Sequence, residues 1–270
     1  MSKEAGHTRT AAPPHGRSIH GRVRRALLAV TVRLCGCAAV PAVLHAQVGH
    51  EPSRSPFRDI VTRQHLTLFG GRFAGHRTVP GVGARPGAFF GIRIETRLSG
   101  PLDLSVSVAS VGSTRRVVNP LLPPDSLQTD STAPRRESGP VDYTLVAADA
   151  ALSLNLTGAK TWHGLAPYLA FGLGIVTPTG AVTDPGGYHA GTNFTLVPTV
   201  GVRYYLGRRV ALRVDARDYY FRYEWPLSYF SPIDPQGNAV PGPVLPIEAR
   251  EVQWTHNFNL AVGLTYAFTF

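Results

Sequence analysis

Cysteine is nearly absent from this 270-residue sequence, and its two copies, Cys35 and Cys37, lie close together near the N-terminus. The chain beyond them therefore has neither a disulfide nor a thiolate metal site. Lysine is almost as rare, since Lys3 and Lys160 are its only copies. Long apolar runs are also missing: no stretch after residue 46 reaches the roughly 18 consecutive apolar residues that a membrane-spanning helix needs. If lipid surrounds this chain, strands must cross it.

The first 46 residues have the composition of a targeting segment. Three arginines (Arg22, Arg24 and Arg25) precede a short apolar stretch, and small residues follow up to Ala46. This order is typical of a secretory signal peptide. The sequence therefore predicts three regions: a signal peptide with an N-terminal extension (1–46), a periplasmic spacer (47–62) and a folded domain (63–270).

Cys37 gives the same segment a second interpretation. Residues 34–37, Leu-Cys-Gly-Cys, resemble a lipoprotein processing box in which Cys37 would carry the lipid. Arg33 would interrupt the apolar region that such a box needs, so we prefer the signal peptide.

The net charge excludes one class of function. The whole chain carries 27 basic and 17 acidic residues, but seven of the basic residues and one acid lie in residues 1–46. The remainder has 20 basic and 16 acidic residues, a net charge of +4. A nucleic-acid-binding protein is not indicated by so small an excess.

Strict alternation of large and small residues marks the C-terminal stretch. In residues 258–270, even positions such as Leu260 and Tyr266 are bulky, whereas odd positions such as Gly263 and Thr265 are small or polar. A period of two predicts a β-strand with one apolar face. The same period recurs seven more times, so we expect eight strands: 65–69, 90–98, 102–109, 146–156, 165–175, 194–205, 210–217 and 258–270.

Alternation alone does not say which face is inside, because an exported lipocalin-like binding barrel would show the same period. In a soluble barrel the outward face carries many Lys and Glu residues. Here the polar face is made of Gly, Ala, Ser, Thr and Asn, with a few charges of both signs. Small residues with nearly balanced charges suit a narrow, enclosed lumen.

Connections between the expected strands alternate in length. Long loops are expected at 73–87, 112–142, 178–193 and 224–252, and tight turns at 99–101, 158–160 and 207–209. This is the arrangement of an outer-membrane barrel, with short turns in the periplasm and long loops outside.

Aromatic residues gather near both ends of the expected strands, as they do at membrane interfaces. Near the turns lie Trp162, Tyr204, Tyr205, Phe268 and Phe270; near the long loops lie Phe73, Phe89, Phe90, Tyr143, Phe194, Tyr219, Tyr220, Phe221 and Trp254.

The closing segment resembles the C-terminal assembly signal of bacterial outer-membrane proteins, through Gly263, Tyr266, Phe268 and Phe270. The chain as a whole resembles the small eight-stranded barrels of the OmpA transmembrane-domain, OmpX and OmpW types. The resemblance implies an all-β, antiparallel, up-and-down transmembrane barrel in the bacterial outer membrane. It also implies the partners expected of such proteins: outer-membrane lipids and lipopolysaccharide, and the barrel-assembly machinery with periplasmic chaperones.

Charged residues on the inward face form the candidate site: Arg93, Glu95, Arg97, Asp103, Asp149, Arg203, Arg213, Asp215 and Arg217. Side chains fill the interior of an eight-stranded barrel, so we expect a structural ion-pair network and not a general diffusion pore. The main alternative is a channel for small anions, which the arginines would favour.

Two further functions stay open. Some barrels of this type are lipid A-modifying enzymes, and His76 and His189 are expected on outer loops with Ser110, Ser113 and Asp184 in the same region, but no spacing links them. Surface binding by the long loops is the other possibility; there, Arg85, Arg115 and Arg116 would meet anionic groups of the outer leaflet. We expect a structural or surface-binding protein that is not an enzyme and has no cofactor.

Overall fold

The computed structural model describes residues 55–180 and 183–268. Eight long strands dominate this part: β2 (Gln64–Ala74), β3 (Gly87–Ser99), β4 (Leu102–Val118), β5 (Glu137–Asn155), β7 (Leu165–Pro178), β8 (Asn193–Tyr205), β9 (Val210–Glu224) and β10 (Val252–Phe268). Two short strands, β1 (Phe57–Asp59) and β6 (Lys160–Trp162), and two short 3₁₀ turns, η2 (Asp125–Leu127) and η3 (Leu227–Tyr229), complete it. Among the described residues, no helix is long and apolar enough to cross a membrane.

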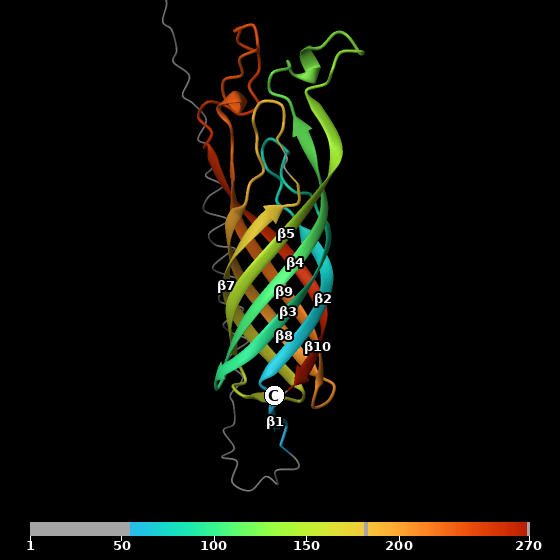
Figure 1. Cartoon of the computed structure of the whole chain (residues 1–270), viewed down its shortest axis with the longest axis vertical. Coiled ribbons are helices and arrows are strands. Elements are labelled where there is room, and N and C mark those ends of the chain that lie inside the picture. Colours follow the sequence, from blue (N-terminus) through green and yellow to red (C-terminus); the bar gives the residue numbers. More distant parts are fainter. Residues whose placement is uncertain (1–54, 181–182, 269–270) are drawn as a thin grey trace, which may run out of the picture. The chain divides into compact units, whose positions relative to one another are not determined.

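The long strands close into a barrel. Each pairs antiparallel with its sequence neighbour, β2 pairs with β10, and every rung runs between adjacent strands. Figure 1 shows the tilted strands, with β1 and the C-terminal end of β10 at the end opposite the long loops. The predicted eight-stranded antiparallel barrel is confirmed, and the predicted signal peptide, Cys37 and Phe270 lie outside the described residues.

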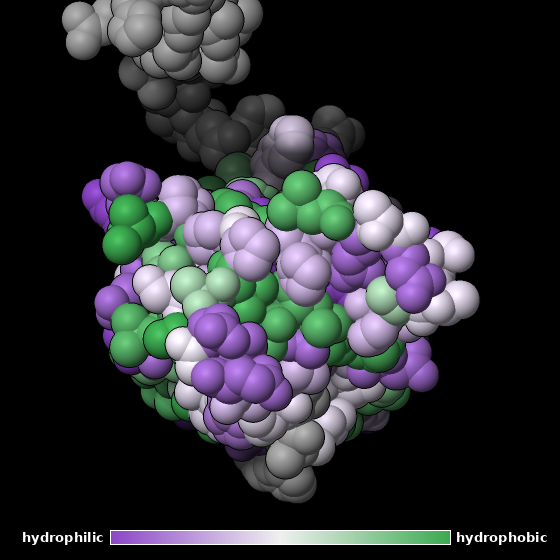
Figure 2. Space-filling view, turned by 90° about the horizontal axis from the view of Figure 1, so that it is seen from above, coloured by the Kyte–Doolittle hydropathy of each residue, from purple (hydrophilic) through white to green (hydrophobic). Residues whose placement is uncertain are grey.

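Large apolar side chains point away from the barrel axis. Leu68, Ile94 and Leu260 on three different strands are 62%, 55% and 59% exposed, whereas Glu95 and Arg203 are 0% exposed. A closed barrel with an apolar outside and a charged inside belongs in lipid and not in water. The lipocalin-like alternative is therefore wrong, and the predicted outer-membrane location is confirmed. The loop end carries a mixture of polar and apolar groups (Figure 2).

The longest predicted loop is shorter than the sequence indicated. β4 continues to Val118 and β5 begins at Glu137, so the connection is 119–136 and not 112–142. The two strands stay paired through Val118 and Glu137 beyond a register shift between Arg115 and Val117. Their hairpin thus extends past the rim of β3, whose pairing with β4 ends at Ala88 and Gly112.

The expected outer aromatic belt also needs correction. Several aromatic residues predicted for an outer belt point inward instead, namely Phe73, Phe89, Tyr143, Tyr219 and Phe221, all of which lie in the buried core cluster. They occupy inward positions of the two-residue period, which outweighs their preference for the interface. Pro198 lies well inside β8.

A short strap crosses the turn end of the barrel. It lies within the predicted spacer, where β1 pairs with β6 through Phe57–Trp162 and two further rungs. The amide of Ile60 donates to the carbonyl of Ala159 (2.9 Å), and Ile60 itself is buried. The strap therefore packs against the turn end of the barrel (Figure 1).

Candidate functional site

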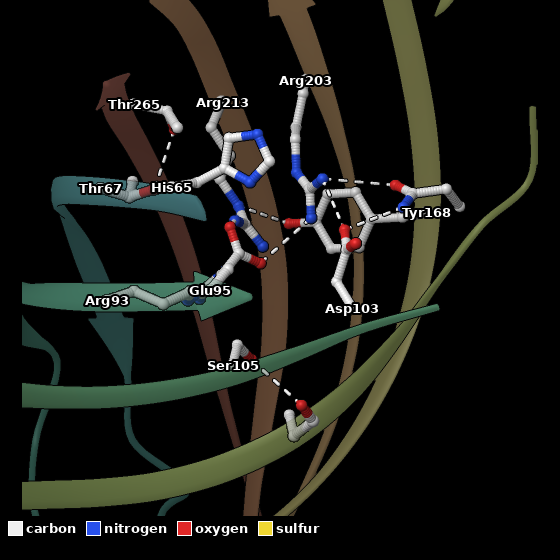
Figure 3. A network of polar contacts seen from close by, with 12 residues as sticks. His65, Thr67, Arg93, Glu95, Asp103, Ser105, Tyr168, Arg203, Arg213 and Thr265 are labelled. Atoms are coloured by element: carbon white, nitrogen blue, oxygen red, sulfur yellow. Dashed lines mark hydrogen bonds and ion pairs between the residues drawn. The ribbon is translucent and has the colours of Figure 1, made fainter. Parts of the chain in front are cut away.

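Glu95 on β3 is the centre of the charged interior. Its carboxylate contacts the guanidinium groups of Arg203 on β8 (3.0 Å) and Arg213 on β9, and all three side chains are at most 1% exposed. Asp103 on β4 extends the group, 3.0 Å from Arg203 and 3.4 Å from Arg97. Figure 3 shows Glu95 and Asp103 converging with Arg203 and Arg213 from opposite walls of the barrel. Burial of such charges is tolerated only when they are paired in this way.

Asp215 on β9 is the second centre. It lies 2.9 Å from both Arg93 and Arg213, and 3.7 Å from Arg217. The hydroxyl of Tyr168 donates to the same carboxylate. Arg217 links this centre to Asp149, at 3.6 Å. The nine charged residues chosen from the sequence therefore lie in one connected network.

Polar residues that the sequence analysis did not choose complete the network. The amide nitrogen of Asn155 donates to Asp103 (2.8 Å), while Ser107 and Tyr219 donate to Asp149 (2.6 and 3.1 Å). The ring of Tyr168 lies under the guanidinium carbons of Arg213 and Arg203, at 4.5 and 4.9 Å. All of these residues occupy inward positions of the two-residue period. A search of the sequence for inward residues with hydrogen-bonding side chains would therefore have identified them.

An aromatic layer fills the interior between the charge network and the outer end. The rings of Phe69 and Phe89 are 5.4 Å apart, and Tyr219 meets Phe89 edge-on at 6.1 Å. Arg93 and Arg217 lie over Phe69 at 5.5 and 5.2 Å, which joins this layer to the charged one. Aromatic contacts of this kind are individually favourable and leave little free space.

Loop residues fold back into the outer end of the barrel. Tyr188, Trp225 and Tyr229 form a stack with centroid separations of 5.8 to 6.3 Å. Burial raises the pKa of Tyr188 and of Tyr229 far above the ordinary value, because desolvation disfavours the phenolate. Near this stack, Arg115 donates hydrogen bonds to both carboxylate oxygens of Asp184, at 2.7 and 2.5 Å. The outer end is therefore occupied by rings and a buried ion pair.

The residues considered for catalysis are not brought together. The Ser113 hydroxyl donates to the carbonyl of Arg85 (2.5 Å), and Asp184 is held by Arg115. His189 contacts only the hydroxyl of Thr183 (3.2 Å) among the hydrogen bonds of the described residues. The other two, His76 and Ser110, share no hydrogen bond with any of these three. No group of three or more His, Cys, Asp or Glu residues in 55–180 and 183–268 is placed to hold a metal ion.

A different histidine, which the sequence did not indicate, pairs with an acid on the outside of the barrel. His256 Nδ1 on β10 is 2.5 Å from Asp218 Oδ2 on β9. The His256 ring packs against Tyr220 at 4.5 Å, and Tyr220 packs in turn on Trp254 at 5.1 Å. Within the described part of the chain, none of the hydrogen bonds of His256 involves a serine or threonine hydroxyl. The pair therefore lacks the nucleophile of a hydrolytic triad.

The remaining predicted residues fall at the two ends. Arg116 pairs with Glu137 at 2.6 Å on the protruding hairpin, and Arg115 is committed to Asp184. At the turn end, the rings of Tyr266 and Phe268 stack 6.5 Å apart on β10. Gly263 is in close contact with β2, because a Cβ there would lie 2.9 Å from the carbonyl oxygen of Leu68.

The closed strand order, apolar exterior and charged interior define an integral outer-membrane barrel of the small eight-stranded class. No family model and no curated protein matches the sequence. Among solved structures, the chain is similar to Neisserial surface protein A (15% identity, 76% of this chain and 97% of that one, TM-score 0.45). It is also similar to OprG from Pseudomonas aeruginosa (9% identity, 77% and 98%, TM-score 0.47) and to Ail of Yersinia pestis (8%, 77% and 97%, TM-score 0.38).

Proposed function

We propose that this outer-membrane barrel is closed to solutes and acts as a rigid scaffold whose outer loops bind a partner at the cell surface. The observation that carries the proposal is the succession of filled layers along the barrel axis. The strap packs against the turn end, the network around Glu95 and Asp215 fills the next level, and aromatic rings occupy the outer half. Interiors of eight-stranded barrels are wide enough for side chains and little else.

The arginines do not favour an anion channel. Each of the five lumen arginines is within 3.7 Å of a carboxylate: Arg93, Arg97, Arg203, Arg213 and Arg217. A permeating anion would have to displace a carboxylate that is fixed to the barrel wall, because the four lumen carboxylates offset all but one of the five positive charges.

The proposed partners during biogenesis and in the membrane follow from the outer surface. We infer that outer-membrane lipids and lipopolysaccharide surround the exposed apolar side chains, among them Leu68 and Leu260. The barrel-assembly machinery and periplasmic chaperones would recognise the C-terminal strand through Tyr266 and Phe268. Outer loops on a rigid barrel are well placed for recognition, because scaffold elements fix loop ends in space.

Planar-bilayer recording tests the closed lumen. The purified, refolded barrel should give no discrete conductance steps in chloride salts, whereas a general porin added to the same bilayer provides the positive control. Steps that are selective for anions and that disappear in an Arg213→Gln variant would replace this proposal with the anion-channel alternative. Tryptophan fluorescence and heat-dependent gel mobility confirm that the tested protein is folded.

A further inference from the structure

Strands β8 and β9 separate near the outer end of the barrel. The register between β8 and β9 ends at Leu196 and Tyr220, yet β8 continues outward to Asn193 and β9 to Glu224. The Thr195 hydroxyl donates to the carbonyl of Tyr220 (3.2 Å), which closes the lower end of the opening. Above this point each strand pairs only with its other neighbour: β8 with β7 and β9 with β10.

The hydrogen bonds of β8 and β9 show which backbone groups face the opening, because the amide and carbonyl groups of successive residues in a strand point toward alternate neighbours. The amide of Leu206 donates to Val210, so even-numbered residues of β8 and β9 face each other. The amide of Trp225 donates to Glu251, so odd-numbered residues of β9 face β10. In an antiparallel ladder the two sets alternate without interruption. The amide and carbonyl groups of Phe194 on one side, and of Arg222 and Glu224 on the other, therefore point into the opening.

A cavity of about 460 Å³ lies at the outer end of the opening, between loop residues 187–192 with Asn193 on one side and the end of β9 on the other. Exposed Arg222 and Glu224 form part of its rim, while inward-facing Tyr143, Val176 and Tyr223 form part of its floor. The cavity thus passes through the wall and reaches the buried rings. Its volume lies within the roughly 300–1,000 Å³ typical of ligand sites.

We propose that this opening, the β8–β9 seam, receives an extended segment of another protein at the cell surface as an added strand. The unpaired amide and carbonyl groups of Phe194 on one side, and of Arg222 and Glu224 on the other, are groups that an extended polypeptide satisfies and an acyl chain does not. One side chain of the added strand would enter the cavity beside Tyr223, and its neighbours would point outward past Arg222. The side chains of Arg222 and Glu224 pair with each other at 2.7 Å. We therefore expect the seam to prefer neither acidic nor basic segments. This inference rests on the proposed surface-binding function.

Cysteine pairs test whether the seam is open. Direct oxidation should join a Leu196→Cys and Tyr220→Cys pair, which lies on the last paired rung. It should not join Phe194→Cys and Arg222→Cys, two residues further out along each strand, because disulfides form only when Cα atoms are within about 7 Å. A short bismaleimide should bridge the outer pair. Rapid disulfide formation at both positions would show that the seam is closed and overturn the proposal.

Peptides test what the seam accepts. A random heptapeptide display library is selected against the full chain in nanodiscs, and a selected peptide is synthesised with and without N-methyl groups on alternate residues. The N-methylated form should bind about tenfold more weakly or worse, because it lacks backbone donors and retains every side chain. Amide exchange of Phe194, Arg222 and Glu224 should slow when the unmodified peptide binds.

The bismaleimide-bridged Phe194→Cys/Arg222→Cys protein should lose binding, while the disulfide-linked Leu196→Cys/Tyr220→Cys protein should keep it. No binder in the library, equal binding of the N-methylated peptide, or full binding to the bridged seam would overturn the inference. A peptide that binds the loops equally well with and without the bismaleimide bridge would support the proposed surface-binding function and refute only the proposal that the seam receives a strand.

Discussion

At the scale of single residues, the interior of this barrel is governed by charge pairing. The two-residue period of the sequence identified which charged residues point into the lumen, but it did not identify which of them form ion pairs with one another. Arg203 meets Glu95 and Asp103 from strands on the opposite wall, and Arg213 meets Glu95 likewise. Such pairs depend on the tilt and stagger of the strands and on side-chain rotamers, which a single sequence does not reveal.

Glu95→Ala should lower the free energy of unfolding by about 3–5 kcal/mol, because it leaves two buried guanidinium groups without their shared carboxylate. Urea unfolding in lipid vesicles, followed by tryptophan fluorescence, measures the change. Glu137→Ala is the matched control: it breaks an ion pair whose side chains are 48% and 50% exposed, and should cost less than about 1 kcal/mol. Equal effects of the two variants would contradict a buried network.

Asp234 in the last outer loop should make a local turn sensitive to acid. Its carboxylate accepts the amides of Asn238 (2.7 Å) and Gln236 (2.9 Å), and the hydrogen bond from Asn238 contributes most to lowering its pKa below the ordinary 3.8. A lowered pKa means that the turn is fully stabilised above pH 3.8 and loses this support as the pH falls through the lower, folded value. Amide shifts of residues 236 and 238 should report the transition, and Asp234→Asn should abolish it.

At the scale of elements, the sequence predicted the membrane-embedded part of every long strand and failed at the outer ends. Alternation is imposed where one face meets lipid and the other meets the lumen, as along β10. Beyond the hydrocarbon the outward face meets water, and the inward face carries polar residues such as Arg115, which is buried against Asp184. Arg115 and Arg116 therefore follow one another in β4, and the hydropathy period disappears although pairing continues. The protruding β4–β5 hairpin was therefore read as a loop.

Pro198 weakens the ladder between β8 and β9. It has no amide hydrogen, its even position faces β9, and the register lacks the rungs between Leu196 and Thr199. Pro198→Ala should restore a donor and raise the free energy of unfolding by about 0.5–1.5 kcal/mol. Pro167→Ala is the control, because its nitrogen faces Leu156, just beyond the end of β5, and its rung with Val202 is intact. No gain from Pro198→Ala, or an equal gain from Pro167→Ala, would show that the missing donor is not the cause.

At the scale of the whole molecule, the barrel has its apolar side chains outside and its charged side chains inside, the reverse of a soluble barrel. The alternation in sequence is compatible with either orientation, and the composition of the polar face decided between them. Val262 on β10 is 56% exposed, while its sequence neighbours Ala261 and Gly263 line the interior face of the wall. In water such an exposed valine would tolerate a charge; in hydrocarbon it would not.

Val262→Arg should therefore destabilise the barrel by about 2–4 kcal/mol in lipid vesicles, the cost of an arginine near the bilayer midplane on a barrel exterior. Val79→Arg provides the control, because Val79 is 72% exposed in an outer loop where the new charge stays in water. Urea titrations monitored by tryptophan fluorescence and by heat-dependent gel mobility give both values. If Val262→Arg were as harmless as Val79→Arg, lipid would not contact this face, and the membrane-spanning orientation would have to be abandoned.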